Sequence, residues 1–221
     1  MIKVSDTSKI AEEKVEERRK IWAPRTSLGK MVAEGRINSI GEVFEQGFKI
    51  KEPEIVDALL PDLKQEVLNV SLVQKQTDAG ERARFKALVA VGNEDGYVGV
   101  GVGKDRQVRA AIEKATSTAK LNIVPVRRGC GSWECDCGQP HSLQFNVSGK
   151  CGSVRIELIP APKGLGLIAN ESVKVMLRLA GVKDCWTKSR GSTKTPSSVI
   201  FATFDAIKNT YNVATPKDWA R

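Results

Sequence analysis

The stretch GERARFKALVAVGN at residues 80–93, followed by GVGVGKDR at residues 99–106, decides the fold of the first half of this chain. It predicts two strands joined by a tight turn, and then a glycine-rich approach to a helix. The cations lie at the ends of these predicted elements, whereas the middles are apolar. Such a unit packs one face against a core and offers the other to an anionic partner.

Residues on either side of this stretch complete a β-β-β-α unit. Its predicted elements are strands at 66–77, 84–91 and 97–102 and a helix at 105–121. The connections are a turn at 78–80 and a hairpin loop at 92–96. Period-two alternation in the first strand predicts that Val70 and either Leu72 or Val73 point inward. The apolar residues of the helix recur at helical spacing, so we expect the helix to cover one face of the sheet.

A second unit, with an α/β pattern, is predicted after residue 123. Its expected elements are strands at 143–147, 154–159 and 184–187 and helices at 169–179 and 197–211. Gly181 suits the position just past the end of the first of these helices. Ahead of both units, residues 9–20 read as a charged helical run and residues 28–60 as short helices. There, Ser39 with Glu42 forms a capping-box pattern, and Pro53 suits the first turn of a helix at 54–60.

The net charge of +9 is unevenly distributed along the chain. Residues 1–60 contain 11 Lys/Arg and 11 Asp/Glu, whereas residues 61–221 contain 24 Lys/Arg and 15 Asp/Glu, so all of the excess lies in the later part. Such an excess indicates nucleic acid, an anionic membrane or phosphorylated ligands as partners. We expect no membrane span, because no apolar run is long enough, and no secretion, because residues 1–20 lack an apolar signal core.

The glycine-rich turn at 99–104 does not match the known phosphate-binding loops. A phosphate loop needs four residues between its glycines and then Lys-Ser/Thr, and the dinucleotide fingerprint spaces its glycines differently. Glycines in a strand instead indicate close approach of another backbone. We therefore expect Lys104, Arg106 and the start of the helix to face phosphates. This layout resembles double-stranded-RNA-binding folds, which contact sugar and phosphate across an A-form helix.

At this point the motifs identify a family. Gly80-x-Arg-x-Arg-Phe-x-Ala-Leu-Val-x-Val-Gly-Asn93 and Gly96-x-Val-Gly-x-Gly-x-Gly-Lys104 strongly resemble the signature of the universal small-subunit ribosomal protein S five family. The second unit agrees through Gly149-x-Cys-Gly-Ser-Val154, Leu158-Ile-Pro-Ala-Pro162 and Ala180-Gly-Val-x-Asp184. The segment before residue 66 resembles the archaeal and eukaryotic branch, and we expect the archaeal form.

The resemblance implies an α+β fold and a domain order. The order is an N-terminal helical extension (1–65), a double-stranded-RNA-binding-like domain (66–123), a C-terminal α/β domain (124–212) and a tail (213–221). It also implies a non-enzymatic role in translation as a constituent of the small ribosomal subunit in the cytoplasm, linked to decoding accuracy. The implied partners are small-subunit rRNA, messenger RNA where it enters the subunit, and proteins S four and S eight, with S two and S three nearby. The loop at 76–84 would reach toward rRNA.

Cations in the first domain and at the start of the second are the predicted phosphate contacts. They are Lys75, Arg82, Arg84, Lys104, Arg106, Arg109, Arg127 and Arg128. A second group lies in the predicted loop 187–197 and comprises Lys188, Arg190 and Lys194. The alternative function is a free double-stranded-RNA-binding module acting outside the ribosome.

Four potential metal ligands fall within twelve residues, in the order Cys130, Cys135, Cys137 and His141. Three thiolates and one imidazole suit tetrahedral zinc, and the glycines and proline between them permit tight turns. The alternative is reduced cysteine in a cytosolic loop, where disulfides are disfavoured. Cys151 and Cys185 are predicted to be small core residues.

A third, distant function is a small-molecule kinase. Pro160 to Ala169 resembles the phosphate loop of the galactokinase–homoserine kinase superfamily, which shares the fold expected for the second domain. Leu167 and Ile168 stand where that loop has two serines, so the hydroxyl contacts to phosphate and magnesium would be lost. We therefore expect a glycine turn that leads into a helix.

Overall fold

The computed structural model describes residues 22–213, and these divide into two compact units on either side of the Leu63–Lys64 bond. The predicted helical run at 9–20 and most of the tail lie outside the described residues. The first unit contains three short helices, α2 (Ser27–Ala33), α3 (Ile40–Glu45) and α4 (Pro53–Leu59). The Ser39 cap of α3 and the proline in the first turn of α4 confirm both sequence predictions.

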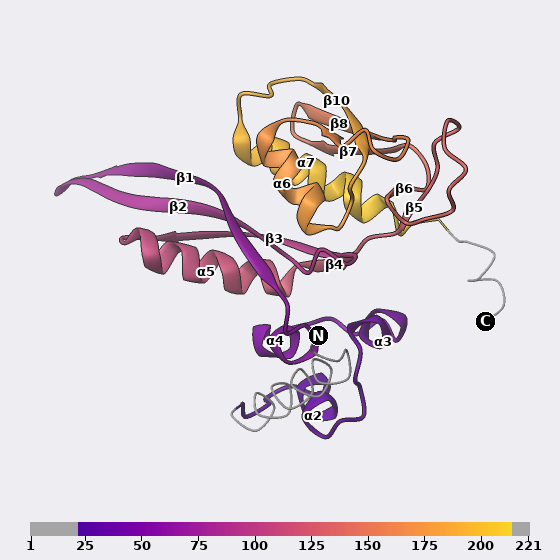
Figure 1. Cartoon of the computed structure of the whole chain (residues 1–221). Coiled ribbons are helices and arrows are strands. Elements are labelled where there is room, and N and C mark those ends of the chain that lie inside the picture. The colour runs from indigo at the N-terminus through magenta and orange to yellow at the C-terminus, as the bar shows by residue number, and fades with distance from the viewer. Residues whose placement is uncertain (1–21, 214–221) are drawn as a thin grey trace, which may run out of the picture. The chain divides into compact units, whose positions relative to one another are not determined.

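The second unit begins with a four-stranded antiparallel sheet in the order β1-β2-β3-β4 (Figure 1). The strands are β1 (Lys64–Thr77), β2 (Gly80–Gly92), β3 (Tyr97–Asp105) and β4 (Ile123–Pro125). The predicted β-β-β-α order is confirmed, but β4 adds a fourth strand in the segment predicted to be a domain boundary. The β1–β2 hairpin is longer than predicted, because β2 starts at Gly80 and leaves only two residues for the turn.

Helix α5 (Val108–Leu121) lies against one face of this sheet because β3 carries glycine at every second position. A Cβ added at Gly101 would overlap the carbonyl oxygen of Ala115, and one at Gly103 would overlap that of Ala111. The prediction that these glycines admit a close backbone is therefore confirmed, and the backbone is that of α5. The helix starts later than predicted, since Asp105 still belongs to β3 and Gln107 is the N-cap residue.

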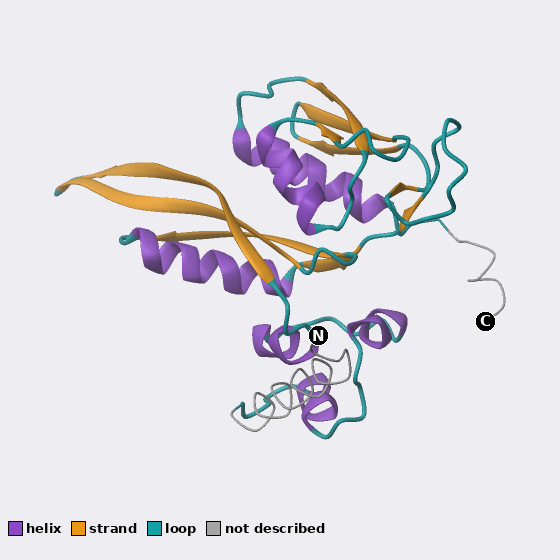
Figure 2. Ribbon diagram, in the orientation of Figure 1, coloured by secondary structure: helices purple, strands orange, loops and turns teal. Residues whose placement is uncertain are grey.

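A second sheet, in the order β7-β8-β10-β9, forms the other side of this unit. Its strands are β7 (Val147–Cys151), β8 (Val154–Pro160), β9 (Leu167–Ile168) and β10 (Cys185–Arg190). Helices α6 (Glu171–Leu179) and α7 (Pro196–Asn209) lie between the two sheets (Figure 2). One core, which includes Leu88, Val100, Ile156, Met176 and Ile200, joins both sheets to these helices.

Three sequence predictions for this unit were wrong. No strand spans 143–147: β6 (Ser142–Leu143) pairs with β5 (Arg128–Gly129), and β7 starts at Val147. The predicted loop at 187–197 begins as strand, since β10 continues to Arg190. In β1, Val70 is 40% and Leu72 54% exposed, because β1 is the edge strand of the sheet and α5 lies mainly against β2 and β3. The predicted α+β fold class is nevertheless confirmed.

Within residues 22–213, none of the helices is both long and apolar enough to cross a bilayer.

The close contact between β3 and α5 predicts that a side chain at Gly101 would strongly destabilise the fold. We expect Gly101→Ala to lower the free energy of unfolding by about 2–3 kcal/mol. The added methyl group would overlap backbone atoms of α5, which cannot move aside as a flexible side chain can. Urea denaturation would measure it. The control Ser117→Ala, on the exposed side of α5, should stay within about 0.5 kcal/mol of the parent protein. Equal stability of the two variants would contradict this account of the glycines.

Candidate functional site

One face of the β1–β2 hairpin gathers the predicted cations. Side chains alternate between the two faces of a strand, and residues paired across strands share a face. Arg82 pairs with Lys75 and Arg84 with Val73 of β1. Lys86, the next residue on that face of β2, pairs with Lys104 of β3. Lys75, Arg82, Arg84 and Lys104 therefore lie on one face, opposite the face that α5 covers. Together with Val73 and Thr77 they line a shallow cavity of about 450 Å³.

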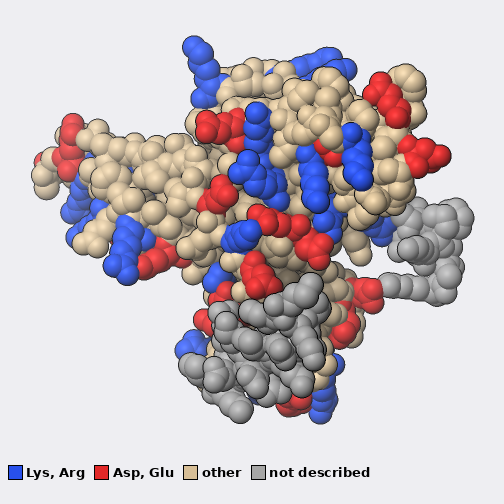
Figure 3. Space-filling view, viewed as in Figure 1, with Lys and Arg blue, Asp and Glu red and all other residues tan. Residues whose placement is uncertain are grey.

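The sequence reasoning missed Lys86, which belongs to the same face. It lies two residues beyond Arg84 in β2 and is paired with Lys104. The signal was available, since Arg82, Arg84 and Lys86 follow the period of a strand. We call the surface formed by Lys75, Arg82, Arg84, Lys86 and Lys104 the basic hairpin face. Figure 3 shows acidic side chains near the tip of the projecting part of the molecule and blue ones along its lower edge.

Other predicted cations of the first domain lie elsewhere. Arg109 belongs to α5, on the other side of the sheet, and its Nε is 3.1 Å from a carboxylate oxygen of Glu113. Arg106 is exposed in the link between β3 and α5. The structure therefore brings four of the six cations of this domain together and leaves Arg106 and Arg109 apart from them.

Arg127 and Arg128 have partners within the chain. The guanidinium of Arg127 lies 4.4 Å from the ring centre of Tyr211 and donates to the carbonyl oxygen of Val213 at 2.6 Å. The Arg128 side chain is 20% exposed and pairs with Asp95. These contacts give both arginines a structural role, and their predicted contact with phosphate stays a prediction.

The second predicted group lies on the second sheet and in the loop that follows it. Lys188 and Arg190 are exposed on β10, two residues apart and therefore on the same face. Lys194 is exposed in the turn before α7.

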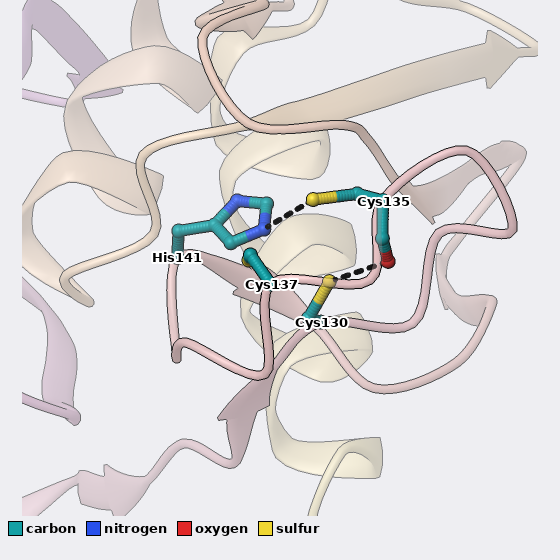
Figure 4. A group of neighbouring side chains, drawn as sticks. All are labelled: Cys130, Cys135, Cys137 and His141. Atoms are coloured by element: carbon teal, nitrogen blue, oxygen red, sulfur yellow. Dashed lines mark hydrogen bonds between the residues drawn. The ribbon is translucent and has the colours of Figure 1, made fainter.

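The four predicted metal ligands lie together in the loop that joins β5 to β6 (Figure 4). Their ligand atoms are all within 4.8 Å of one another, and Cys135 Sγ is 3.8 Å from His141 Nε2. A tetrahedron with Zn–S bonds of about 2.3 Å has edges of roughly 3.8 Å, so three thiolates and one imidazole fit zinc in composition and in spacing. The cluster could hold a metal.

A buried carboxylate fixes the histidine of this cluster. Asp184 Oδ2 lies 2.8 Å from His141 Nδ1, and both side chains are about 5% exposed. This contact leaves Nε2 directed toward Cys135. A carboxylate on the far nitrogen of a histidine is a common second layer of metal sites, because it sets the orientation and the tautomer of the ring. Sequence reasoning missed Asp184, which is 43 residues from His141 along the chain.

The same carboxylate also orders the glycine turn that resembled a kinase loop. Its other oxygen, Oδ1, accepts hydrogen bonds from the amides of Gly164 at 3.1 Å and Gly166 at 2.7 Å. These are the backbone amides that would otherwise be open to a phosphate, and an acidic side chain occupies them. The arrangement therefore favours the expected glycine turn.

The pKa values of Cys135, in the cluster, and Cys185, in the core, are shifted in opposite directions. The pKa of Cys135 is lowered to about 6, first by a hydrogen bond from the backbone of Lys163 and then by interactions with Cys137. Thiolate is the form that binds metal. In contrast, burial raises the pKa of Cys185 to about 12. Cys185 is fully buried, which confirms it as a core residue, whereas Cys151 is partly buried and packs against the core from its edge.

Asp184 should be a strong determinant of stability even without metal. We expect Asp184→Ala to lower the free energy of unfolding by about 3 kcal/mol or more, because it leaves a buried imidazole and two amides without their acceptor. Chemical denaturation in chelator would exclude any contribution from bound metal. The control Asp95→Ala removes a carboxylate that is 79% exposed and should cost less than about 1 kcal/mol. A change at Asp184 as small as that at Asp95 would refute the role given to it.

Comparison with known proteins agrees with the motifs in both halves of the chain. Residues 63–127 match the family described as "Ribosomal protein S5, N-terminal domain", and residues 149–221 match "Ribosomal protein S5, C-terminal domain". The cysteine cluster lies between the two matched segments.

Archaeal relatives match across most of the chain. "Small ribosomal subunit protein uS5" of Pyrobaculum calidifontis is 65% identical over 86% of this chain and 95% of its own length. The protein of the same name from Thermofilum pendens is 61% identical over 90% of this chain and 98% of its length. The protein of the same name from Saccharolobus solfataricus is 55% identical over 90% of this chain and 94% of its own length. The chain therefore belongs to the ribosomal protein S5 family.

Proposed function

We propose that this chain is a structural constituent of the small ribosomal subunit in the cytoplasm, and that it binds rRNA and neighbouring ribosomal proteins. The observation that carries the proposal is the match of both halves to one family of ribosomal proteins, with archaeal relatives named for the small subunit. The basic hairpin face supports it, because it supplies a surface of positive charge on a projecting element.

The basic hairpin face suits contact with the RNA backbone better than reading of bases. Its charged members are lysine and arginine, and the described part of the face presents no aromatic side chain. Contacts of this kind are made to phosphates, position the protein on RNA and weaken steeply with salt. We propose Lys75, Arg82, Arg84 and Lys104 as the principal phosphate contacts, with Lys86 added from the structure. The other proposed contacts lie outside this face; they are Arg106, Arg109, Arg127, Arg128, Lys188, Arg190 and Lys194.

The family resemblance extends this proposal to particular neighbours. These are proteins S four and S eight, S two and S three nearby, and messenger RNA where it enters the subunit, with an influence on decoding accuracy. The proposed division of the second unit into domains 66–123 and 124–212 belongs here too, although one core joins the two parts.

We further propose that Cys130, Cys135, Cys137 and His141 bind one structural zinc ion. The support is the donor set, the spacing of the ligand atoms and the buried Asp184 behind the histidine. Bound zinc would hold the β5–β6 loop in a fixed conformation.

Substitution of the basic hairpin face tests RNA binding. We expect the fourfold change of Lys75, Arg82, Arg84 and Lys104 to alanine to reduce the slope of log affinity against log salt by about 3–4 for an RNA duplex. The matched control replaces four exposed lysines elsewhere, Lys30, Lys49, Lys51 and Lys208, and removes the same charge. Filter binding at several salt concentrations measures both. Equal losses in the two variants would show that net charge, and not this face, binds the duplex.

Incorporation into subunits tests the function itself. Tagged chain expressed in an archaeal host should sediment with small subunits through high salt, and crosslinks should identify its protein neighbours. Release at modest salt, with no footprint on rRNA, would reject the ribosomal proposal in favour of a free RNA-binding module.

Metal analysis tests the zinc site. Protein purified without chelator should contain about one zinc per chain, and Cys137→Ser should lose it. Cys151→Ser is the matched control, since Cys151 lies outside the cluster, and should keep the metal. A zinc content near zero in the unmodified chain would reject the site.

A further inference from the structure

The second sheet has one covered and one uncovered face. A Cβ added at Gly149 of β7 would overlap the backbone of α7 at Ala202 and Ala206, so α7 lies directly on that face. Along β7, Ser148 and Lys150 alternate with Gly149 and are exposed. They lie on the other face, over which no helix of the described chain is placed (Figure 2).

Strand pairing arranges the side chains of the uncovered face in three rows. Residues paired across neighbouring strands share the face. From one end of the sheet to the other, the rows are Ile159, Trp186 and Ile168, then Ser148, Glu157 and Lys188, then Lys150, Arg155 and Arg190. The face therefore changes from apolar at one end to strongly basic at the other, with four cations and a single carboxylate.

An open cavity of about 570 Å³ lies at the apolar end of this face. Trp186, Ile159 and Lys188 line it from the sheet, and Trp133 and the acidic Glu134 line it from the loop that carries the cysteine cluster. The two tryptophans are 42% and 93% exposed, respectively. Large aromatic side chains on a surface with no protein cover indicate a binding site.

We propose that this uncovered face binds a single-stranded segment of RNA, with an unpaired base stacked on Trp186 and the backbone following Lys188 and Arg190. The inference deepens the proposed function and depends on it, because it adds a second RNA surface of a different kind. The excess of cations over carboxylates favours a polyanion over a protein partner. An aromatic ring at one end of a basic strip is the combination that single-strand binding proteins use.

The aromatic side chain also indicates which form of RNA binds here. In a duplex the faces of the bases are stacked on one another and are not available to an indole ring. Only an unpaired nucleotide can place its base on Trp186. The basic hairpin face has cations without an aromatic platform and suits phosphates of a duplex, so the two surfaces should respond to different ligands.

The test compares two RNA ligands on the full-length chain. Fluorescence anisotropy would measure affinity for an oligouridine of about 12 nucleotides and for a duplex of about 16 base pairs. We expect Trp186→Ala to weaken oligouridine binding about five- to hundredfold and to leave duplex binding within about twofold. Trp186→Phe should retain most of the affinity, because phenylalanine still stacks. Ile168→Ala, in the same row and 43% exposed, is the matched non-aromatic control and should change little.

Each outcome separates this inference from the proposed function. Unchanged oligouridine binding by Trp186→Ala would overturn the stacking site, whereas duplex binding by the basic hairpin face would still stand. Photo-crosslinking in assembled subunits provides a second readout. A nucleotide adduct on the peptide that contains Trp186 supports the inference. Crosslinks from Lys188 to another protein, without any nucleotide adduct, would overturn it and identify the face as a protein interface.

Discussion

The contact between the glycine-rich strand β3 and helix α5 is the constraint on which the rest of the second unit depends. Because Gly99, Gly101 and Gly103 have no side chains, the helix backbone lies directly on the sheet, and the alanines of α5 fill the remaining space. The intervening residues of β3, among them Val98 and Val100, then point to the opposite face and join the common core. Strand β3 thus packs on both faces, with glycines against α5 and valines against the common core.

This double packing explains where positive charge can collect. At the base of the β1–β2 hairpin, β2 lies between α5 and the helices of the common core, and its apolar residues are buried there. Beyond Phe85 the hairpin extends past that support, so its side chains need no apolar partner. The same alternation that buries Leu88 and Ala90 places Arg82 and Arg84 on one exposed face, with the half-buried Lys86 beside them.

Sequence reasoning succeeded where a pattern is local. The glycine alternation, the turn residues and the Cys/His spacing each lie within a short segment, and the structure brings the four metal-ligand candidates together as predicted. Sequence reasoning failed where contacts between distant segments determine which side chains are buried or what role they have. Alternation in β1 cannot reveal that this strand lies at the edge of the sheet, largely outside the cover of α5. A register shift between Val67 and Asn69 displaces the pattern further. The role of Asp184 depends on a contact across 43 residues, which spacing cannot show.

The shared core has a consequence for biosynthesis. Ribosomes make the β-β-β-α part first, and its strands pair with neighbours that are close in sequence, so they can form early. Helices α6 and α7, which cover the second face of that sheet, are made about 75 to 110 residues after β3 begins. Until they emerge, Leu88, Ala90, Val98 and Val100 remain exposed to solvent as a continuous apolar surface. Exposed apolar surface of this kind promotes aggregation of folding intermediates, so completion of the second half is what protects this sheet.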